Sequence, residues 1–529
     1  MTGCISKNDG NGGKTHNIPK LRLSLSNLFV SIPIVIVIGT IWLAFVIFRQ
    51  LLSILLKIWY GKRFGGMMSA ADAIWMSKRE SSPVIHALVV YKSKIKTADE
   101  FSAHIHEYAR RLFLDDNPNT HTKINGIHKS FLGYTYYLND MLTENDCHTV
   151  LNLDSIDKDY LEDSDLSDIL DDCNKMPLPY KNKALWEVVT LSKPLKPDGD
   201  AHKYVVIFRV NHAFGDGLSA IYYLFHYIAD KRADFVKDMS ELVKKFGVGE
   251  DSDRGIMKKL KYFFRICYCI ACAPIVVFNE QGFRKYTNSL HGPKLSGEKH
   301  FVYSTEHPDE HLMEAIRQIK KGVPRATFTG IIATGISRAL QTYFITNCKE
   351  IPELVIGGTV ALLSLPNLNG YPKLENNVCL GPVVLPMLRG RVSIQEQLKE
   401  VSEQIELLRD TPYFMVKYLL TVFFIGYFPS PITKFCLDQE VSATFSLSNI
   451  PGFPDTPSFG QETKDFYFFT PNLQRIGVGF CVLTYQDKLR IGLVVDKVLV
   501  PQKEAVQDLV DNVIKELRLM YEEYKLNNI

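Results

Sequence analysis

The segment with the clearest chemical potential covers residues 210–217, which fit the pattern H-x-x-x-D-G at His212, Asp216 and Gly217. An imidazole titrates near neutral pH, so His212 is suited to act as a general base that takes the proton of an alcohol. An alcohol activated in this way can attack a thioester directly, and the imidazolium then protonates the leaving thiolate. Asp216 would fix the loop through a backbone or arginine partner, and Gly217 permits a positive φ or close helix packing. The pattern alone fits a structural histidine in a turn equally well.

The residues on either side of this segment predict how it is held. Residues 204–210 are apolar almost throughout, which is typical of a central strand covered on both faces. From Gly217 onward the apolar residues recur at helical spacing, at positions 218, 221, 222, 225 and 228. His212 is therefore expected at a strand-to-helix turn, where rigid elements can hold a side chain in a cleft.

The N-terminal part of the chain has the composition of a membrane segment. No charged residue occurs between Leu23 and Phe48, which is enough apolar chain to cross a bilayer as a helix. The apolar core begins later and runs longer than that of a cleaved signal peptide. We therefore expect a polar tail at residues 1–22, then one retained transmembrane helix and an interfacial segment over residues 23–60. Four basic residues lie near each end, so charge does not settle the topology.

Bulk properties exclude several other classes. A chain of 529 residues is expected to form two packed domains, and a net charge of +3 with no long basic run makes nucleic acid an improbable partner. Cys269 and Cys272 form one C-x-x-C, but no second pair completes a zinc site, so buried or membrane-surface thiols, open to palmitoylation, fit better. The acidic residues between 152 and 172 lack the glycine and terminal glutamate of a calcium loop. No metal site and no bound cofactor are expected.

Apolar periodicity after residue 60 predicts a mixed α/β fold with two similar halves, at residues 61–245 and 300–529, joined by a crossover at 246–299. The apolar stretch at 262–278 is interrupted by Pro274, and the one at 413–428 is short and contains Lys417. Neither is predicted to span a membrane; the second is expected to be a buried or monotopic helix. The clearest strands are expected at 186–191, 204–210, 354–363, 378–385, 443–447, 476–485 and 489–495, with helices at 329–343, 394–408 and 503–524.

Six segments, in order, resemble the wax ester synthase/acyl-CoA:diacylglycerol acyltransferase (WS/DGAT) family of the chloramphenicol-acetyltransferase-like superfamily. The segment 211–217 resembles the family's H-H-x-x-x-D-G active site, and Ser448 to Gly452, Ser-Asn-Ile-Pro-Gly, resemble its S-N-V-P-G turn. The other four are residues 68–75, Leu185 with Trp186, residues 375–377 with 381–386, and residues 485–496. The likeness covers nearly everything after residue 65.

The resemblance implies two chloramphenicol-acetyltransferase-like domains with a tunnel between them. It also implies a membrane-bound O-acyltransferase that moves a long-chain acyl group from acyl-CoA to a lipid alcohol, giving triacylglycerol or wax ester. By this resemblance His212 is the general base and Asp216 is structural, while Asn211, Ser448 and Asn449 are candidate substrate-binding residues. Acyl-CoA enters as a substrate. Because acyl-CoA is cytosolic, the catalytic part is expected on the cytosolic side of the endoplasmic reticulum or plasma membrane.

Three positions depart from the family pattern. Asn211 replaces the first histidine of the pair, Ala184 replaces a proline, and Thr329-Gly330 stand where the family has Asn-Asp at the start of a helix. These changes leave open an alternative from another class, a lipid-binding or scaffold protein with impaired catalysis. A serine lipase is disfavoured, because the sequence contains no G-x-S-x-G nucleophile elbow.

Overall fold

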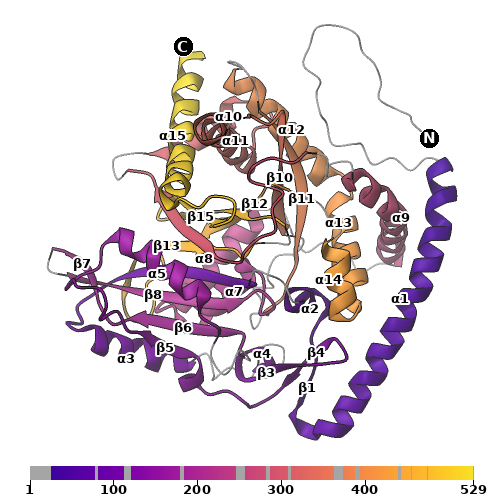
Figure 1. Ribbon diagram of the computed structural model, residues 1–529, viewed down its shortest axis with the longest axis horizontal. Coiled ribbons are helices and arrows are strands. Elements are labelled where there is room, and N and C mark those ends of the chain that lie inside the picture. The colour runs from indigo at the N-terminus through magenta and orange to yellow at the C-terminus, as the bar shows by residue number, and fades with distance from the viewer. Residues whose placement is uncertain are drawn as a thin grey trace.

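The computed structural model describes two six-stranded β-sheets with helices packed against them (Figure 1). It describes residues 25–77, 82–111, 121–178, 184–199, 201–245, 256–281, 286–307, 311–348, 350–362, 373–387, 393–438, 443–453, 455–472 and 475–527. The predicted mixed α/β fold with two halves is confirmed.

The first sheet belongs mainly to the N-terminal half and supports the H-x-x-x-D-G loop. Its central strand is β8, whose middle residues are buried because both faces of the sheet are covered, as the apolar run predicts. The order is β13 (Glu462–Phe469), β2 (Val84–Ser93), β8 (Ala201–Asn211), β6 (Trp186–Leu191) and β5 (His148–Leu151), with β7 (Leu195–Asp198) also paired to β8. A small separate sheet contains β1 (Phe64–Met67), β4 (Tyr134–Leu138) and β3 (Ile127–Phe131).

The second sheet belongs to the C-terminal half. Its order is β11 (Val378–Pro386), β10 (Leu354–Leu362), β12 (Phe445–Phe453), β14 (Val478–Tyr485), β15 (Lys488–Asp496) and β9 (Lys299–Thr305). The segment 448–452, expected as a turn, lies inside β12, because parallel pairing with β14 holds it extended up to a register shift after Ile450.

One strand crosses from the C-terminal half into the other sheet. β13 pairs antiparallel with β2, so that Phe468 lies opposite Ala87. The two halves are thereby joined through backbone hydrogen bonds as well as through side-chain packing. The sequence did not predict this strand.

Helices cover the sheets and connect the halves. Those of the N-terminal part are α2 (Ala70–Ala73), η2 (Ile74–Met76), α3 (Ala98–Ala109), α4 (His121–Asn125), α5 (Asp163–Lys175), α7 (Gly217–Ile228) and α8 (Arg232–Lys245). Those of the C-terminal part are α10 (Leu312–Gly322), α11 (Phe328–Asn347), α12 (Ile394–Asp410), α13 (Tyr413–Tyr418), η6 (Leu419–Phe424), η7 (Ile425–Tyr427), α14 (Ser430–Asp438) and α15 (Lys503–Asn527). Two further short helices in the described part of the chain are η1 (Gly61–Arg63) and η4 (Glu144–Asp146).

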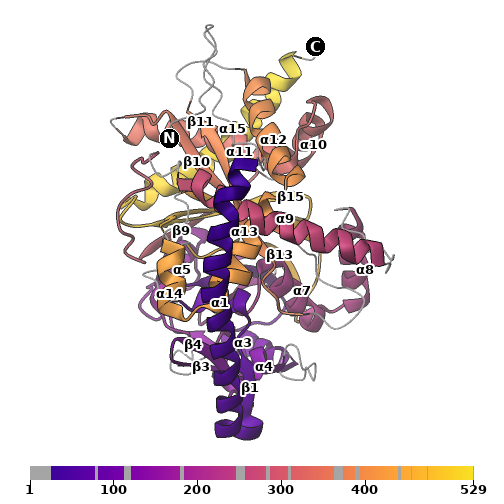
Figure 2. The same cartoon turned by 90° about the vertical axis from the view of Figure 1, so that its right-hand side faces the viewer.

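Two long apolar helices, α1 (Leu25–Tyr60) and α9 (Ile256–Gln281), lie against each other at one side of the molecule (Figures 1 and 2). Over Ser31–Arg63 and Phe263–Gln281 the chain is long and apolar enough to cross a membrane. The apolar stretch at 262–278, expected to be interrupted at Pro274, lies within one continuous helix, α9, which buries Cys272 and Val276 in the core.

The first sheet contains a buried ion pair whose loss we expect to be costly. Arg209 on β8 and Glu187 on β6 pair with almost no exposure to solvent. Burial raises the pKa of the Glu187 carboxyl, and the adjacent Arg209 opposes that shift. Arg209→Met should lower the free energy of unfolding by about 3–5 kcal/mol, because it strands the carboxylate in the core. Urea unfolding measures this, and Glu187→Leu/Arg209→Met should recover most of the loss. A single variant as stable as wild type would contradict it.

Candidate active site

The H-x-x-x-D-G loop connects β8 to α7, as the sequence predicts. Asp216 is the N-cap of α7 and accepts a hydrogen bond from the Ser219 amide at 2.8 Å. Its second carboxylate oxygen accepts a hydrogen bond from the backbone N–H of Asn377 at 3.0 Å, so Asp216 also links the loop to the C-terminal half. Burial raises the pKa of the Asp216 carboxyl, and these amide donors oppose the shift. Asp216 therefore holds the loop in shape, the structural role that the sequence suggested.

The residues next to this carboxylate also shape the loop. The Asn211 side-chain oxygen accepts from the Ala213 amide at 2.9 Å, which closes an Asx turn just before α7. A Cβ on Gly217 would lie 2.6 Å from Cδ1 of Ile450, so close packing against β12, and no unusual backbone angle, explains the glycine. Asn211 is buried and does not line the cavity described below, so its proposed contact with substrate stays a prediction.

The His212 imidazole is held on two sides. Its ring is stacked on the Trp75 indole, with 3.6 Å between ring centroids and 14° between planes. Its Nδ1 lies 2.9 Å from Oδ1 of Asn376. The Asn376 amide nitrogen donates to Asp72 at 2.7 Å and to the His212 carbonyl at 2.8 Å, which turns its oxygen toward the ring. The His212 Nδ1 must then carry the proton, so the lone pair lies on Nε2.

The buried ammonium group of Lys123 helps to hold Asp72 and the loop around His212 in place. Asp72 also forms an ion pair with Lys123 at 2.8 Å, and both side chains are buried. The Lys123 ammonium donates to the carbonyl of Phe214 at 3.0 Å and to that of Leu374 at 2.8 Å, so the active loop and the 374–377 segment share one cation. Asp72 and Asn376 lie inside two of the segments that resemble the family, and this was the only indication of them in the sequence. Nothing in the sequence indicated Lys123.

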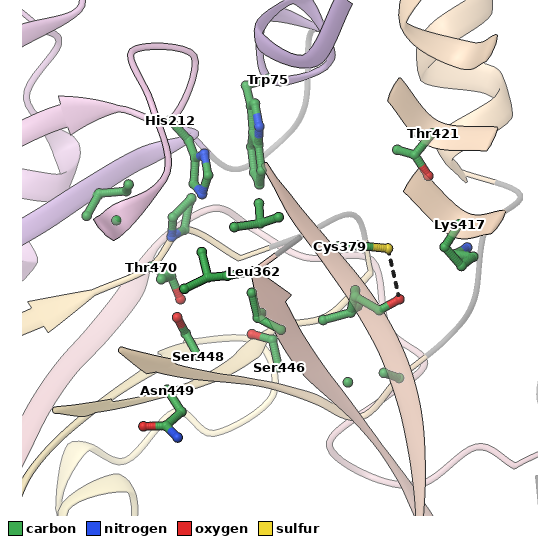
Figure 3. Close-up of a pocket in the computed structure, with 18 of the residues that line it drawn as sticks. Trp75, His212, Leu362, Cys379, Lys417, Thr421, Ser446, Ser448, Asn449 and Thr470 are labelled. Carbon is green, nitrogen blue, oxygen red and sulfur yellow. Dashed lines mark hydrogen bonds between the residues drawn. The ribbon is translucent and has the colours of Figure 1, made fainter. Parts of the chain in front are cut away.

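His212 opens on a cavity of about 160 Å³ between the two halves (Figure 3). Most of its wall is apolar, formed by side chains from both sheets and from the helices around Trp75, Lys417 and Leu437. Residues that line it include Ile74, Ile85, Leu218, Val360, Leu362, Leu380, Ser446, Ser448, Asn449, Ile450, Phe468 and Thr470. Such a wall suits hydrocarbon chains, and the few polar groups near His212 suit a reacting centre.

The candidate residues of β12 divide between its two faces. The hydroxyls of Ser446 and Ser448 lie on the His212 side of the strand, whereas the Asn449 amide points the other way (Figure 3). Asn449 donates to the Thr329 hydroxyl at 3.3 Å, so the Thr329-Gly330 departure keeps a polar contact with this strand. A Cβ on Gly330 would lie 2.5 Å from the Ser402 hydroxyl, so packing of α11 on α12 favours glycine there. Ser448 is thus the better placed of the two candidates to contact a substrate oxygen.

This geometry is competent for proton abstraction in a water-poor setting. A neutral imidazole with its lone pair on Nε2 can accept the proton of a hydroxyl, and the Nδ1–H bond to Asn376 fixes the ring. Hydroxyl donors on β12 offer a place for negative charge to develop on an oxygen.

Comparison with known protein families gives a match in the C-terminal half of the chain. The family model described as the WS/DGAT C-terminal domain matches residues 376–520. No curated protein sequence matches the chain.

Solved structures match nearly the whole chain at low identity. The wax ester synthase/diacylglycerol acyltransferase from Marinobacter aquaeolei VT8 is 14% identical with a TM-score of 0.55, covering 86% of this chain and 100% of that one. A trichothecene 15-O-acetyltransferase from Fusarium sporotrichioides is 12% identical with a TM-score of 0.54, and the match covers 86% of this chain and 95% of that one. The first condensation domain of the CDA synthetase is 13% identical with a TM-score of 0.53, and the match covers 88% of this chain and 96% of that one. These likenesses establish the shared fold, and the family match shows that residues 376–520 are similar to the WS/DGAT C-terminal domain.

Proposed function

We propose that the protein transfers a long-chain acyl group from acyl-CoA to a lipid alcohol, with His212 as the general base. The observation that carries this is the amide of Asn376, which fixes His212 with its basic nitrogen at an apolar cavity between the two halves. The similarity of residues 376–520 to the WS/DGAT C-terminal domain supports acyl transfer as the reaction class. Diacylglycerol and fatty alcohols are the acceptor classes that this family implies.

The reaction needs no acyl-enzyme. Nε2 of His212 takes the hydroxyl proton as the alcohol oxygen attacks the thioester carbonyl, and the carbon–oxygen bond forms. The resulting oxyanion is stabilised by hydrogen-bond donors such as the Ser448 hydroxyl, and then collapses to expel the coenzyme A thiolate. The imidazolium returns its proton to that sulfur. The products are an ester and free coenzyme A, and His212 is neutral again.

The alternative of a catalytically impaired scaffold finds little support in the site. Asn211 forms a turn bond that shapes the loop, and the base is the second residue of the pair, His212, which is present. Thr329 keeps a polar contact with Asn449. Both departures therefore leave the arrangement around His212 in place.

The acceptor class is tested by supplying the purified full-length chain with palmitoyl-CoA and a panel of hexadecanol, monoacylglycerol and diacylglycerol. We expect ester from at least one member of the panel, because the cavity wall suits hydrocarbon chains. The product is identified by mass spectrometry, with boiled protein as the control. No ester from any acceptor, together with measurable lipid binding, would favour the scaffold alternative.

We further propose that α1 holds the enzyme at a membrane, with the catalytic part on the cytosolic side. Its outward residues Ile36, Ile47 and Ile54 are exposed, whereas Leu52 and Leu56 enter the core. Replacing those three isoleucines together with glutamate should release the protein from membranes without unfolding it, because each charge removes apolar contact with lipid. Carbonate extraction and circular dichroism measure the two effects. A folded variant that stays in the membrane pellet would contradict anchoring by α1.

A further inference from the structure

We propose that the lipid alcohol enters the His212 cavity sideways from the bilayer, through the wall formed by η6 and the last turn of α9. This inference rests on the proposed function. The proposed occupant of the passage is the hydrocarbon chain of a membrane lipid.

The first observation concerns α1, which is docked along its length and apolar on its outer side. Its less exposed residues recur every three or four positions: Ser31, Val35, Gly39, Trp42, Phe45, Arg49, Leu52 and Leu56. Trp42 donates its indole N–H to the Phe423 carbonyl at 3.0 Å and stacks on the Phe423 ring. Phe45 meets Phe428 edge to face at 5.2 Å. A helix of 36 residues is about 54 Å long, so this outer face is extensive.

The second observation is that α9 and η6 extend the same apolar surface. The large side chains Phe263, Phe264 and Phe278 of α9 are exposed, Phe278 to 80%. Phe423 on η6 is 53% exposed beside Trp42 of α1. Soluble proteins seldom leave many large apolar side chains exposed on two adjoining helices, and the membrane-spanning composition of both helices indicates that lipid covers them.

The third observation is that these elements are also the cavity wall. Glu280 in the last turn of α9, Lys417 on α13, Thr421 on η6 and Leu437 on α14 all line the cavity. Figure 3 shows Lys417 and Thr421 on the side of the cavity opposite His212. Between the cavity and α1 the wall is one helix thick, because η6 places Thr421 at the cavity and Phe423 at α1.

The wall combines a fixed point with an irregular segment. Lys417 and Glu280 form a buried ion pair at 2.9 Å, to which the Tyr413 hydroxyl also donates, so the end of α9 is tied to α13. η6, the next six residues, is a π-helix, a rare form that is frequent at functional sites. The buried ion pair fixes one side of the wall, and the π-helix beside it is wound more loosely than an α-helix. This combination suits a passage that opens for a hydrocarbon chain and closes again.

The size of the cavity calls for such a passage. Its volume of about 160 Å³ lies well below the ~300 Å³ or more that a drug-sized ligand requires, so two long hydrocarbon chains must extend beyond it. If the hydrocarbon chain of a water-insoluble alcohol extended from the cavity through the lipid-covered wall, most of that chain could stay in the bilayer during the reaction.

Thr421→Trp, which narrows the passage, and Phe278→Glu, which charges its outer rim, test the proposal. Each is assayed in the full chain with palmitoyl-CoA and two acceptors: hexadecanol in phosphatidylcholine vesicles, and water-soluble 1-butanol. The readout is the ratio of kcat/KM for hexadecanol to kcat/KM for butanol. We expect both variants to lower this ratio about tenfold, through the hexadecanol value, since binding of the membrane-borne acceptor is what they impair.

Val150→Glu is the matched control, because Val150 is an exposed residue of the edge strand β5, on the side of the molecule away from α1 (Figure 1). It should leave the ratio at the wild-type value, and vesicle co-sedimentation should show that all variants remain membrane-bound. An unchanged ratio in both Thr421→Trp and Phe278→Glu would overturn this route. Failure of the wild-type chain to esterify either alcohol would instead overturn the proposed function.

Discussion

Replacing His212 with alanine is expected to lower kcat by about 10²–10⁴-fold, which is the usual contribution of a positioned general base. The reason is geometric. Asn376 and Trp75 hold the ring with its basic nitrogen at the cavity, and no second histidine stands beside it, because residue 211 is asparagine. The measurement is steady-state ester formation from palmitoyl-CoA and the best acceptor.

The fold of the His212→Ala protein must be checked beside its activity, because the ring packs on Trp75. Circular dichroism and thermal melting serve this purpose. His202→Ala, on the same strand β8 but outside the cavity lining, is the matched control and should keep wild-type activity. A folded His212→Ala protein with near wild-type kcat would remove His212 from the mechanism.

Asn376→Leu is expected to have the second largest effect, a fall in kcat of about 10²-fold, because a misplaced catalytic group can lose that much rate. The substitution nearly preserves side-chain size but removes the bonds to the His212 ring, the His212 carbonyl and Asp72. Asn376 acts through His212, so it is a positioning residue. The KM for acyl-CoA should therefore change much less than kcat.

The neighbouring Asn377→Leu is the control for this experiment. Asn377 reaches Asp216 through its backbone amide, which the substitution keeps. It should reduce kcat far less than Asn376→Leu does. Equal losses in the two variants, or a loss in Asn376→Leu confined to KM, would show that the amide of Asn376 does not orient the base.

Local patterns were sufficient to predict the elements that carry His212. The strand expected at 186–191 matches β6, and the apolar run at 204–210 lies within β8. The change of spacing at Gly217 marks the first residue of α7. In each case the side chains of one short segment report which faces of that segment are buried, so periodicity is enough.

Long-range contacts were beyond the sequence. Asn376 meets His212 across 164 positions, and Lys123 reaches Leu374 across 251, so no local pattern places either beside the loop. β13 joins the far sheet because its partner is β2, which no property of residues 462–469 reveals. Likewise α9 tolerates Pro274 because tertiary packing of its buried face offsets the lost backbone hydrogen bond.

The most direct test of the central claim follows both products of one reaction. The full-length chain is given palmitoyl-CoA with and without the preferred lipid alcohol, and free coenzyme A thiol and ester are measured over time. Direct transfer predicts that the two appear in equal amounts, only when alcohol is present, and that both are lost in His212→Ala. Thiol release without alcohol, or no ester from any lipid alcohol, would contradict the account.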